Sequence, residues 1–268
     1  MSAYAEVIGD PIAHSKSPLI HGFWIEALGI DAAYRATHVL ANDLGGYFAR
    51  RQADVDWRGC NITLPHKEPS LAFVADPGGV KASIGAINCV IRQDGVLIGT
   101  NTDAAGFYAP IADMELEGAQ AVLVGAGGAA RAILFALARA RVGEVTILNR
   151  NVLKAAALLA SFGLKGEARP LGTSLPPADL LVNSSALGMK GQPPLDLDLA
   201  PLPDHAVVYD IVYAPLETPL LAAARARDLA TVDGLEMLIA QAGLAFELFF
   251  DQAPPRHRDA ELRTLLTA

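Results

Sequence analysis

A glycine-rich segment between an apolar strand and an alanine-rich helix constrains this chain more than any other feature. The sequence at this point is Val122-Leu123-Val124-Gly125-Ala126-Gly127-Gly128-Ala129-Ala130. Its surroundings predict a strand over 121–124, a helix over 129–141 and a second strand over 144–149. Strand, crossover helix and strand in this order form a βαβ unit. The segment therefore favours an α/β fold with a parallel sheet.

The same segment has the pattern G-x-G-x-x-A that dinucleotide-binding turns require. Gly125 permits a tight turn and Gly127 lets the backbone approach a pyrophosphate. Around them, Ala126, Gly128 and Ala129 open a helix whose free N–H groups and dipole attract an anion. The alternative is a glycine-rich turn that binds nothing.

The end of the second strand indicates which dinucleotide fits. An acidic residue there would bind a ribose 2′-hydroxyl and repel a 2′-phosphate. This chain instead has Asn149 and Arg150, with Lys154 one turn further on. A guanidinium suits a phosphate and a lysine adds charge, so NADP is favoured over NAD. Without the preceding glycine-rich segment, Arg150 and Lys154 would be interpreted as solvated basic residues at the start of a helix.

The remaining sequence predicts further alternation of strands and helices over 268 residues, a length that favours two modest domains or one large one. Before the glycine-rich segment we expect strands over 3–8, 33–39 and 59–63, helices over 18–29 and 43–51, a helix beginning at Pro65, and a hairpin of 86–92 with 96–100. After it we expect strands over 179–183, 206–212 and 230–232 and helices over 219–227 and 235–250. We therefore predict a mostly parallel α/β substrate domain over 1–103, a Rossmann-type NADP-binding domain over 104–234, and C-terminal helices over 235–268 that return to the first domain.

Composition excludes several classes of protein. A net charge of −8 disfavours nucleic acid and anionic lipid as partners. Cys60 and Cys89 lack metal-ligand spacing and are expected to be free thiols in a reducing compartment. The six histidines form no ligand cluster, so we predict no metal. With no basic, apolar leader and no apolar run of about 18 residues, a cytoplasmic protein without membrane contact is expected.

Two ionisable residues are candidates for proton transfer. Lys67 is predicted in the first turn of the helix opened by Pro65, where the helix dipole would lower the pKa of its amine. Asp103 follows the predicted hairpin and could pair with Lys67. The alternatives are a solvated surface lysine and an aspartate that caps a helix or forms a turn.

Polar residues near both ends of the chain suggest a ligand site. Ser17 precedes Pro18 and is predicted to cap the following helix. Ser15 and Ser17, beside that helix N-terminus, could instead bind a carboxylate. Gln241 interrupts the apolar stripe of the last long helix and needs a partner unless it is exposed.

Taken together, these segments resemble the shikimate dehydrogenase family over nearly the whole chain. The resemblance is specific because the motifs occur in order: Gly9-Asp10-Pro11, His14 to Pro18, Asn61 to Lys67, Gly85 to Asn88, Asn101 to Asp103, Gly125 to Ala130, Asn149-Arg150, Asn183 to Met189, Tyr209-Asp210 with Tyr213, Pro215 and Thr218, and Asp233 to Gln241.

The resemblance implies reversible NADP-linked reduction of 3-dehydroshikimate to shikimate, a step of chorismate and aromatic amino acid biosynthesis, in a cleft between the two domains. Lys67 and Asp103 match the family's catalytic pair. The resemblance further implies a carboxylate site at Ser15 and Ser17, substrate contacts from Thr63, Asn88, Tyr213 and Gln241, and a nicotinamide side lined by Met189 and Gly234.

The chain departs from the family pattern at a few positions. Ala104 stands where we expect glycine, and Cys89 where we expect threonine. Asn151 replaces the usual threonine or serine after Arg150. The sequence Ser184 to Ala186 is unusual for the segment before Leu187. A quinate or quinate/shikimate dehydrogenase, or a paralogue acting on a related ring acid, stays open as an alternative. A catalytically silent NADP-binding regulator stays open as a second alternative. The oligomeric state also stays open, and a homodimer is one expectation.

Overall fold

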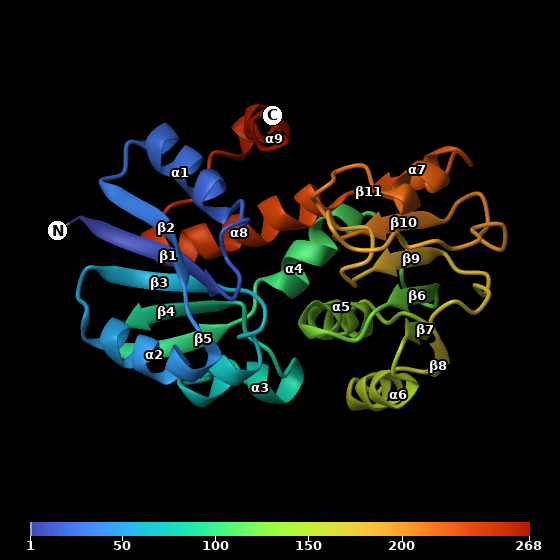
Figure 1. Ribbon diagram of the computed structural model, residues 1–268, viewed down its shortest axis with the longest axis horizontal. Coiled ribbons are helices and arrows are strands. Elements are labelled where there is room, and N and C mark those ends of the chain that lie inside the picture. Colours follow the sequence, from blue (N-terminus) through green and yellow to red (C-terminus); the bar gives the residue numbers. More distant parts are fainter. Residues whose placement is uncertain (1) are drawn as a thin grey trace. The chain divides into compact units, whose positions relative to one another are not determined.

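The computed structural model describes residues 2–268, which divide into two compact units. Unit 1 contains the chain as far as Asp103 together with Ile239–Ala268. Unit 2 is Ala104–Leu238. Two helices pass from one unit into the other along the chain, α4 (Asp103–Tyr108) and α8 (Gly234–Phe250). Figure 1 labels the elements of both units.

Unit 1 is built on a five-stranded mixed sheet of order β2-β1-β3-β4-β5. Its strands are β1 (Ala3–Gly9), β2 (Ala32–His38), β3 (Trp57–Ile62), β4 (Cys89–Gln93) and β5 (Val96–Thr100). β1 pairs in parallel with β2 and β3, whereas β3–β4 and β4–β5 are antiparallel. The predicted hairpin is confirmed, because Asp94 and Gly95 both have positive φ, 51° and 78°, as a type I′ turn requires.

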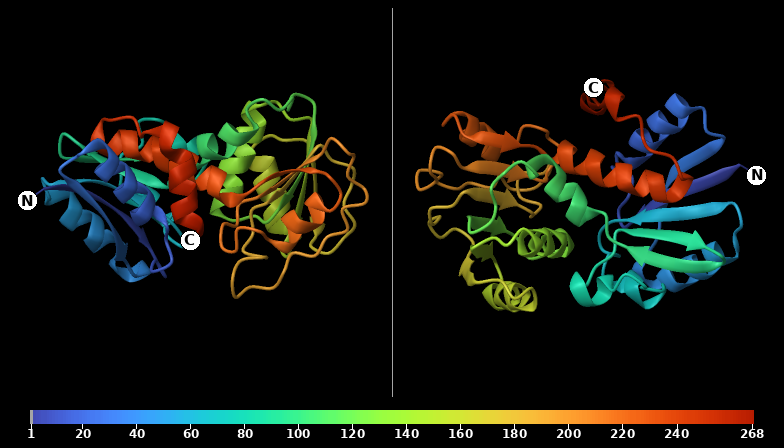
Figure 2. Two further views of the ribbon diagram at one scale, coloured as in Figure 1. Left: turned by 90° about the horizontal axis from the view of Figure 1, so that it is seen from above. Right: turned by 180° about the vertical axis from the view of Figure 1, so that it is seen from behind.

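Helices cover both faces of this sheet, as Figures 1 and 2 show. The unit contains α1 (Ser17–Leu28), α2 (Leu44–Ala53), α3 (Val80–Ser83), α9 (Asp259–Thr267), most of α8, and short 3₁₀ turns at Ala41–Asp43, Pro69–Ala72 and Arg256–Arg258. On one face, Trp24 of α1 packs edge-on against Phe246 of α8, with ring centroids 5.4 Å apart. On the same face Ala5 and Cys89 pack with Phe249 of α8. The C-terminal part of α8 therefore belongs to the core of unit 1.

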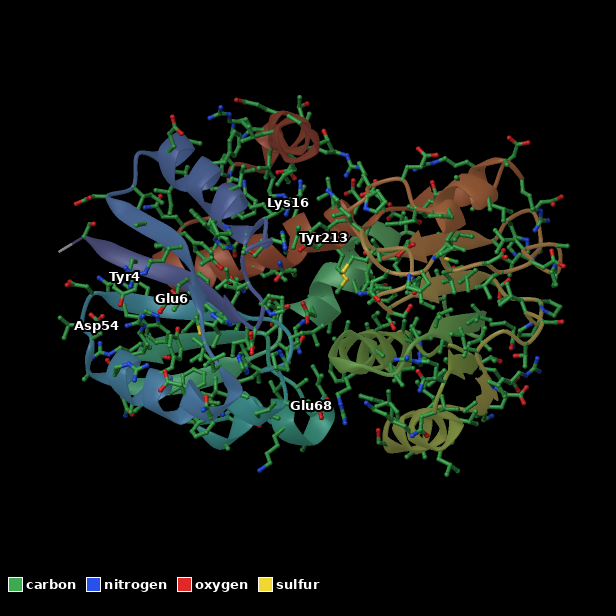
Figure 3. The ribbon with its side chains drawn as sticks, in the orientation of Figure 1. Tyr4, Glu6, Lys16, Asp54, Glu68 and Tyr213 are labelled. Carbon is green, nitrogen blue, oxygen red and sulfur yellow. The ribbon has the colours of Figure 1, made fainter. Side chains whose placement is uncertain are left out.

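The opposite face of the sheet buries the carboxylate of Glu6 on β1 (Figure 3). Burial alone would raise the pKa of Glu6, but hydrogen bonds from Arg51, Thr37 and Tyr47 outweigh it and leave the pKa below its usual value. The Tyr47 hydroxyl donates at 2.8 Å and the Trp57 indole N–H at 3.0 Å. Because the donors come from β2, β3 and α2, this network joins those three elements to β1.

Unit 2 is built on a six-stranded parallel sheet of order β11-β10-β9-β6-β7-β8. Its strands are β6 (Gln120–Val124), β7 (Glu144–Asn149), β8 (Gly166–Pro170), β9 (Leu180–Asn183), β10 (Val207–Asp210) and β11 (Ala230–Val232). Read from β8, the order is 3-2-1-4-5-6 within the unit, the doubly wound order of dinucleotide-binding domains. The prediction of a Rossmann-type domain is confirmed.

Three helices and the loops between strands cover this sheet. They are α5 (Gly128–Arg139), α6 (Val152–Ser161) and α7 (Pro219–Arg225), with a 3₁₀ turn at Ala109–Ile111. Figure 1 shows α5 and α6 side by side along one side of the sheet. Leu220 and Leu221 of α7 share a buried cluster with Val122, Leu181 and Val208. Both faces of the sheet are thus covered, as a parallel sheet requires.

Two local predictions are wrong. No α-helix begins at Pro65, because 64–68 form turns that lead into the 3₁₀ segment Pro69–Ala72. The helix dipole assigned to Lys67 is therefore absent. Ser17 is the first residue of α1 rather than its cap, and the backbone N–H of Ser17 is instead bonded to the Ser15 hydroxyl at 3.3 Å.

Ala104 lies in α4 and is not among the residues with positive φ, so alanine does not strain this turn. Cys60 and Cys89 are buried free thiols, as predicted. Within residues 2–268, no helix is both long and apolar enough to cross a membrane, and no cluster of three or more potential metal ligands occurs.

Candidate active site

An ion pair between Lys67 and Asp103 lies at the centre of a polar cluster in unit 1. The Lys67 ammonium donates to Asp103 Oδ2. The side chains are only 15% and 7% exposed, so this pair is shielded from solvent, unlike most ion pairs of the protein. The backbone of Asp103 is fixed as well, because its N–H donates a hydrogen bond to Asn101 Oδ1 at 3.0 Å. A sequestered amine paired with a fixed carboxylate is suited to proton transfer.

Asn88 connects this pair to the rest of the cluster. Its Nδ2 donates to Asp103 Oδ1 at 2.8 Å and to the Thr102 hydroxyl at 2.9 Å. Its Oδ1 accepts the Thr102 backbone N–H at 2.7 Å. The Asn88 amide is therefore fixed in orientation, and both Asp103 oxygens have a defined partner.

Gln241 reaches the same cluster from α8. Its Oε1 lies 3.3 Å from Asn88 Nδ2 and 3.4 Å from the Thr102 hydroxyl. Gln241 is 8% exposed, which rules out the solvated alternative. Thr102 is a site residue that the sequence analysis missed. The one signal available was its position between two polar residues, Asn101 and Asp103.

The remaining predicted substrate residues of unit 1 lie at strand and helix ends. Ser15 and Ser17 lie at the start of α1, with Ser17 buried. Thr63 directly follows β3, and its backbone N–H donates to Ile8 O at 2.9 Å. Lys16 lies between the two serines (Figure 3), and its ammonium donates a hydrogen bond to the Leu266 carbonyl of α9. The serine segment is thereby tied to the C-terminal helix.

In unit 2, the glycine turn follows β6 at the point where the strand order reverses. Gly125 has φ +103°, and an added Cβ would lie 3.0 Å from Ser184 Oγ. Glycine is therefore required there by conformation and by space. A Cβ on Gly127 would meet nothing within 4 Å, and no described side chain caps α5, which begins after it. Backbone N–H groups beside open space fit a pyrophosphate.

The end of β7 presents the predicted basic residues. The Asn149 amide donates to Asn151 O at 2.9 Å, and Asn151 Oδ1 accepts the Lys154 N–H at 2.9 Å as the cap of α6. Arg150 and Lys154 are exposed. Asn151 thus has a structural role at the helix start, and Arg150 is available for a ligand.

A buried network shapes the loops after β9 and β10. Asp210 Oδ1 accepts from Asn183 Nδ2 at 2.9 Å, and Oδ2 accepts from the Thr218 hydroxyl at 2.7 Å. Burial raises the pKa of Asp210 above its usual value. Asn183 also donates to Leu187 O at 3.0 Å, which fixes the segment leading to Met189.

The other predicted residues of unit 2 lie on these loops. Met189 is 41% exposed and lines a pocket with Gly188, Ala214 and Pro215. Tyr213 follows β10, and Gly234 begins α8. A Cβ on Gly234 would lie 2.4 Å from Ile211 O, so close backbone packing explains this glycine.

The glycine turn in the doubly wound fold of unit 2 and the Lys67–Asp103 cluster of unit 1 define a two-domain α/β oxidoreductase that uses a nicotinamide dinucleotide. Two family models match the chain: the shikimate dehydrogenase substrate binding domain over residues 7–90 and shikimate / quinate 5-dehydrogenase over 109–187. The chain belongs to the shikimate dehydrogenase family.

Relatives of known name cover the whole chain. The shikimate dehydrogenase (NADP(+)) of Sphingopyxis alaskensis is 65% identical over 268 residues, covering 100% of this chain and 98% of that protein. The shikimate 5-dehydrogenase of Thermus thermophilus, solved with NADP(H) and shikimate, is 36% identical with a TM-score of 0.88, covering 98% of this chain and 99% of that one. The ligand-free 5-ketofructose reductase of a Gluconobacter strain is 32% identical with a TM-score of 0.89, covering 99% of each chain.

Proposed function

We propose that this protein catalyses the reversible NADP-dependent reduction of 3-dehydroshikimate to shikimate. The observation that carries the proposal is the shielded Lys67–Asp103 pair, held by Asn88 in a unit whose partner unit has a dinucleotide fold. The named activity of the Sphingopyxis relative and the shikimate and NADP(H) bound to the Thermus enzyme support the choice of substrate and cofactor.

The reaction needs a proton at the ketone oxygen when a hydride reaches the ketone carbon. NADPH, when bound, supplies the hydride. Lys67 is the proton donor to the oxygen, and Asp103 orients the amine and the substrate hydroxyl by accepting hydrogen bonds. In the reverse direction the same amine accepts the proton from shikimate.

The polar residues around the pair bind and orient the substrate. Ser15 and Ser17 are the carboxylate donors at the start of α1. Thr63, Asn88, Gln241 and Tyr213 contact or position the ring hydroxyls. Buried hydrogen-bonding groups of this kind reject an analogue that lacks a hydroxyl, because its partner would stay unpaired.

Unit 2 holds the cofactor by its strand ends. The turn of Gly125, Ala126, Gly127, Gly128 and Ala129 receives the pyrophosphate. Asn149, Arg150 and Lys154 surround the 2′-phosphate, and Met189 and Gly234 lie on the nicotinamide side. Substrate binding is accordingly assigned to 1–103, cofactor binding to 104–234 and a return to the first domain to 235–268. That the protein forms a homodimer is a further prediction. Light scattering of the purified protein would test it by measuring its molar mass in solution.

Replacing the proton donor tests the assignment directly. Lys67→Ala is expected to lower kcat with shikimate by at least about 10²-fold, because proton transfer loses its positioned group. The Kd for NADP should stay within about twofold of the wild-type value. The matched control is Lys81→Ala, which removes an exposed lysine of the same unit and should leave kcat unchanged. Wild-type turnover in Lys67→Ala would remove the proton-transfer role.

A further inference from the structure

Tyr34 of β2 is an aromatic residue that the proposed chemistry does not use, yet its hydroxyl enters the polar part of unit 1. The hydroxyl donates to Asn61 Oδ1 at 2.6 Å. Asn61 is the next-to-last residue of β3 and is 5% exposed. Its amide nitrogen lies 3.4 Å from the Asn88 carbonyl. Hydrogen bonds therefore connect Tyr34 to the backbone of the residue that holds Asp103.

Small residues on β1 and β3 allow the Tyr34 side chain to reach β3. β2 and β3 are not neighbours, since β1 lies between them. Tyr34 is opposite Ala5 in register, and Ala5 is opposite Gly59 on β3. These small residues leave the space over β1 free for an aromatic ring. The space over Gly59 itself is taken by Phe249, since a side chain added at Gly59 would meet the Phe249 ring at 2.5 Å. Tyr34 packs against the cluster that contains Ala5 and Phe249.

A second aromatic ring fixes the tyrosine in place. His21 of α1 stacks on Tyr34 with ring centroids 3.9 Å apart and an interplanar angle of 2°. Both His21 ring nitrogens are buried and make no hydrogen bond to any described residue. Burial lowers the pKa of His21 to about 3, so the ring is neutral at pH 7. The contact is therefore a packing contact that holds the phenol without competing for its hydroxyl.

The same phenol is close to a proposed carboxylate donor. Burial raises the pKa of Tyr34 well above its usual value, and the nearby Ser17 side chain opposes this rise. Ser17 and His21 are separated by one turn of α1. The tyrosine therefore lies between the start of α1, which carries Ser17, and the end of β3, which directly precedes Thr63.

We propose that Tyr34 is a positioning residue for the substrate site, which fixes the Asn61 amide and through it the segment that carries Asn88. The proposal rests on the proposed function, because it assigns Asn88 and the Lys67–Asp103 pair to the substrate. Without the hydroxyl, Asn61 Oδ1 loses a donor inside the protein and the amide can rotate. Substrate affinity then falls while the proton donor itself is untouched.

The test uses Tyr34→Phe, which keeps the stacked ring and removes only the hydroxyl. We expect the KM for shikimate to rise about 5- to 50-fold, in line with an unpaired buried acceptor. We expect kcat to change less than about threefold and the Kd for NADP to stay constant. The matched control is Tyr47→Phe, which removes a hydroxyl bound to Glu6 on the opposite face of the same sheet. It should lower Tm without raising the KM for shikimate.

A double-mutant cycle with Asn61→Leu gives a second readout of the same contact. Asn61→Leu alone should raise the KM, and adding Tyr34→Phe should raise it no further, because both changes break one connection. An unchanged KM in Tyr34→Phe, an equal rise in Tyr47→Phe, or additive effects in the cycle would overturn the proposal. Wild-type oxidation of shikimate and its loss in Lys67→Ala are measured alongside, so a failure of the proposed function is recognised separately.

Discussion

At the scale of single residues, the proposed function assigns chemistry and recognition to different side chains. Lys67 and Asp103 form the shielded pair, whereas Asn88 and Gln241 bring donors and acceptors to it from a loop and from α8. In unit 2 the equivalent division lies between the glycine turn, which offers backbone groups, and Arg150, which offers charge. Each role therefore has a substitution that tests it alone.

Arg150 is expected to determine the preference for NADP. Arg150→Ala should raise the KM for NADP about 10- to 100-fold, since a charge-assisted hydrogen bond to the 2′-phosphate is lost. The KM for NAD, which has no such phosphate, should stay unchanged. Arg139→Ala, an exposed arginine at the far end of α5, is the control. An equal loss for both cofactors in Arg150→Ala would place the phosphate contact elsewhere.

Sequence patterns predicted the residues of the site better than their surroundings. Local patterns predicted Asp103 and Gln241 and the family resemblance implied Asn88, but the helix predicted to begin at Pro65 does not exist. The helix was predicted from Pro65 and the polar residues that follow it. This short pattern is equally compatible with the turns found at 64–68. Thr102 and Tyr34 were missed because their importance arises from contacts between distant parts of the chain.

At the scale of elements, the strongest predictions were those in which turn chemistry and periodicity agree. The glycine turn, α5 and β7 follow the predicted βαβ pattern, and the 93–95 hairpin turn has the two positive φ values that its Asp-Gly sequence permits. β8 was missed because Gly166–Pro170 is short, mostly exposed and bounded by glycine and proline. Its place at the sheet edge depends on pairing with β7, which no local signal reveals.

The two glycines of the turn should respond differently to the same substitution. Gly125→Ala forces a side chain at φ +103° and should lower the free energy of unfolding by about 1–3 kcal/mol. Gly127→Ala has φ −98° and open space, so Tm should change by less than about 2 °C. Its methyl group should instead weaken NADP binding at least about tenfold by keeping the pyrophosphate from the backbone. Normal NADP affinity in folded Gly127→Ala would argue against a pyrophosphate at this turn.

At the scale of the whole molecule, burial of ionisable groups makes stability depend on pH. His21 has a folded-state pKa of about 3, below its ordinary 6.5, because burial disfavours its charged form. The unfolded chain therefore binds a proton more readily than the folded one. Stability contributed by neutral His21 is complete above pH 6.5 and is lost as the pH falls toward 3.

Removing this titration should flatten the acid side of the stability curve. His21→Phe keeps a ring on Tyr34, and its free energy of unfolding should fall by about 2 kcal/mol less than that of the wild type between pH 7 and pH 5. In this range the Glu6 carboxylate stays charged, so its own loss occurs at lower pH. Urea unfolding at the two pH values measures the difference. Parallel curves for the two proteins would show that His21 is not the group responsible.

Initial rates of the purified protein with shikimate and with quinate, each against NADP and NAD, test the proposed function. Absorbance of the reduced nicotinamide follows all four reactions. We expect shikimate with NADP to give the highest kcat/KM, because Arg150 favours a 2′-phosphate and the Sphingopyxis relative is named as a shikimate dehydrogenase (NADP(+)). A higher kcat/KM with quinate or with NAD, or no turnover with any pair, would contradict it.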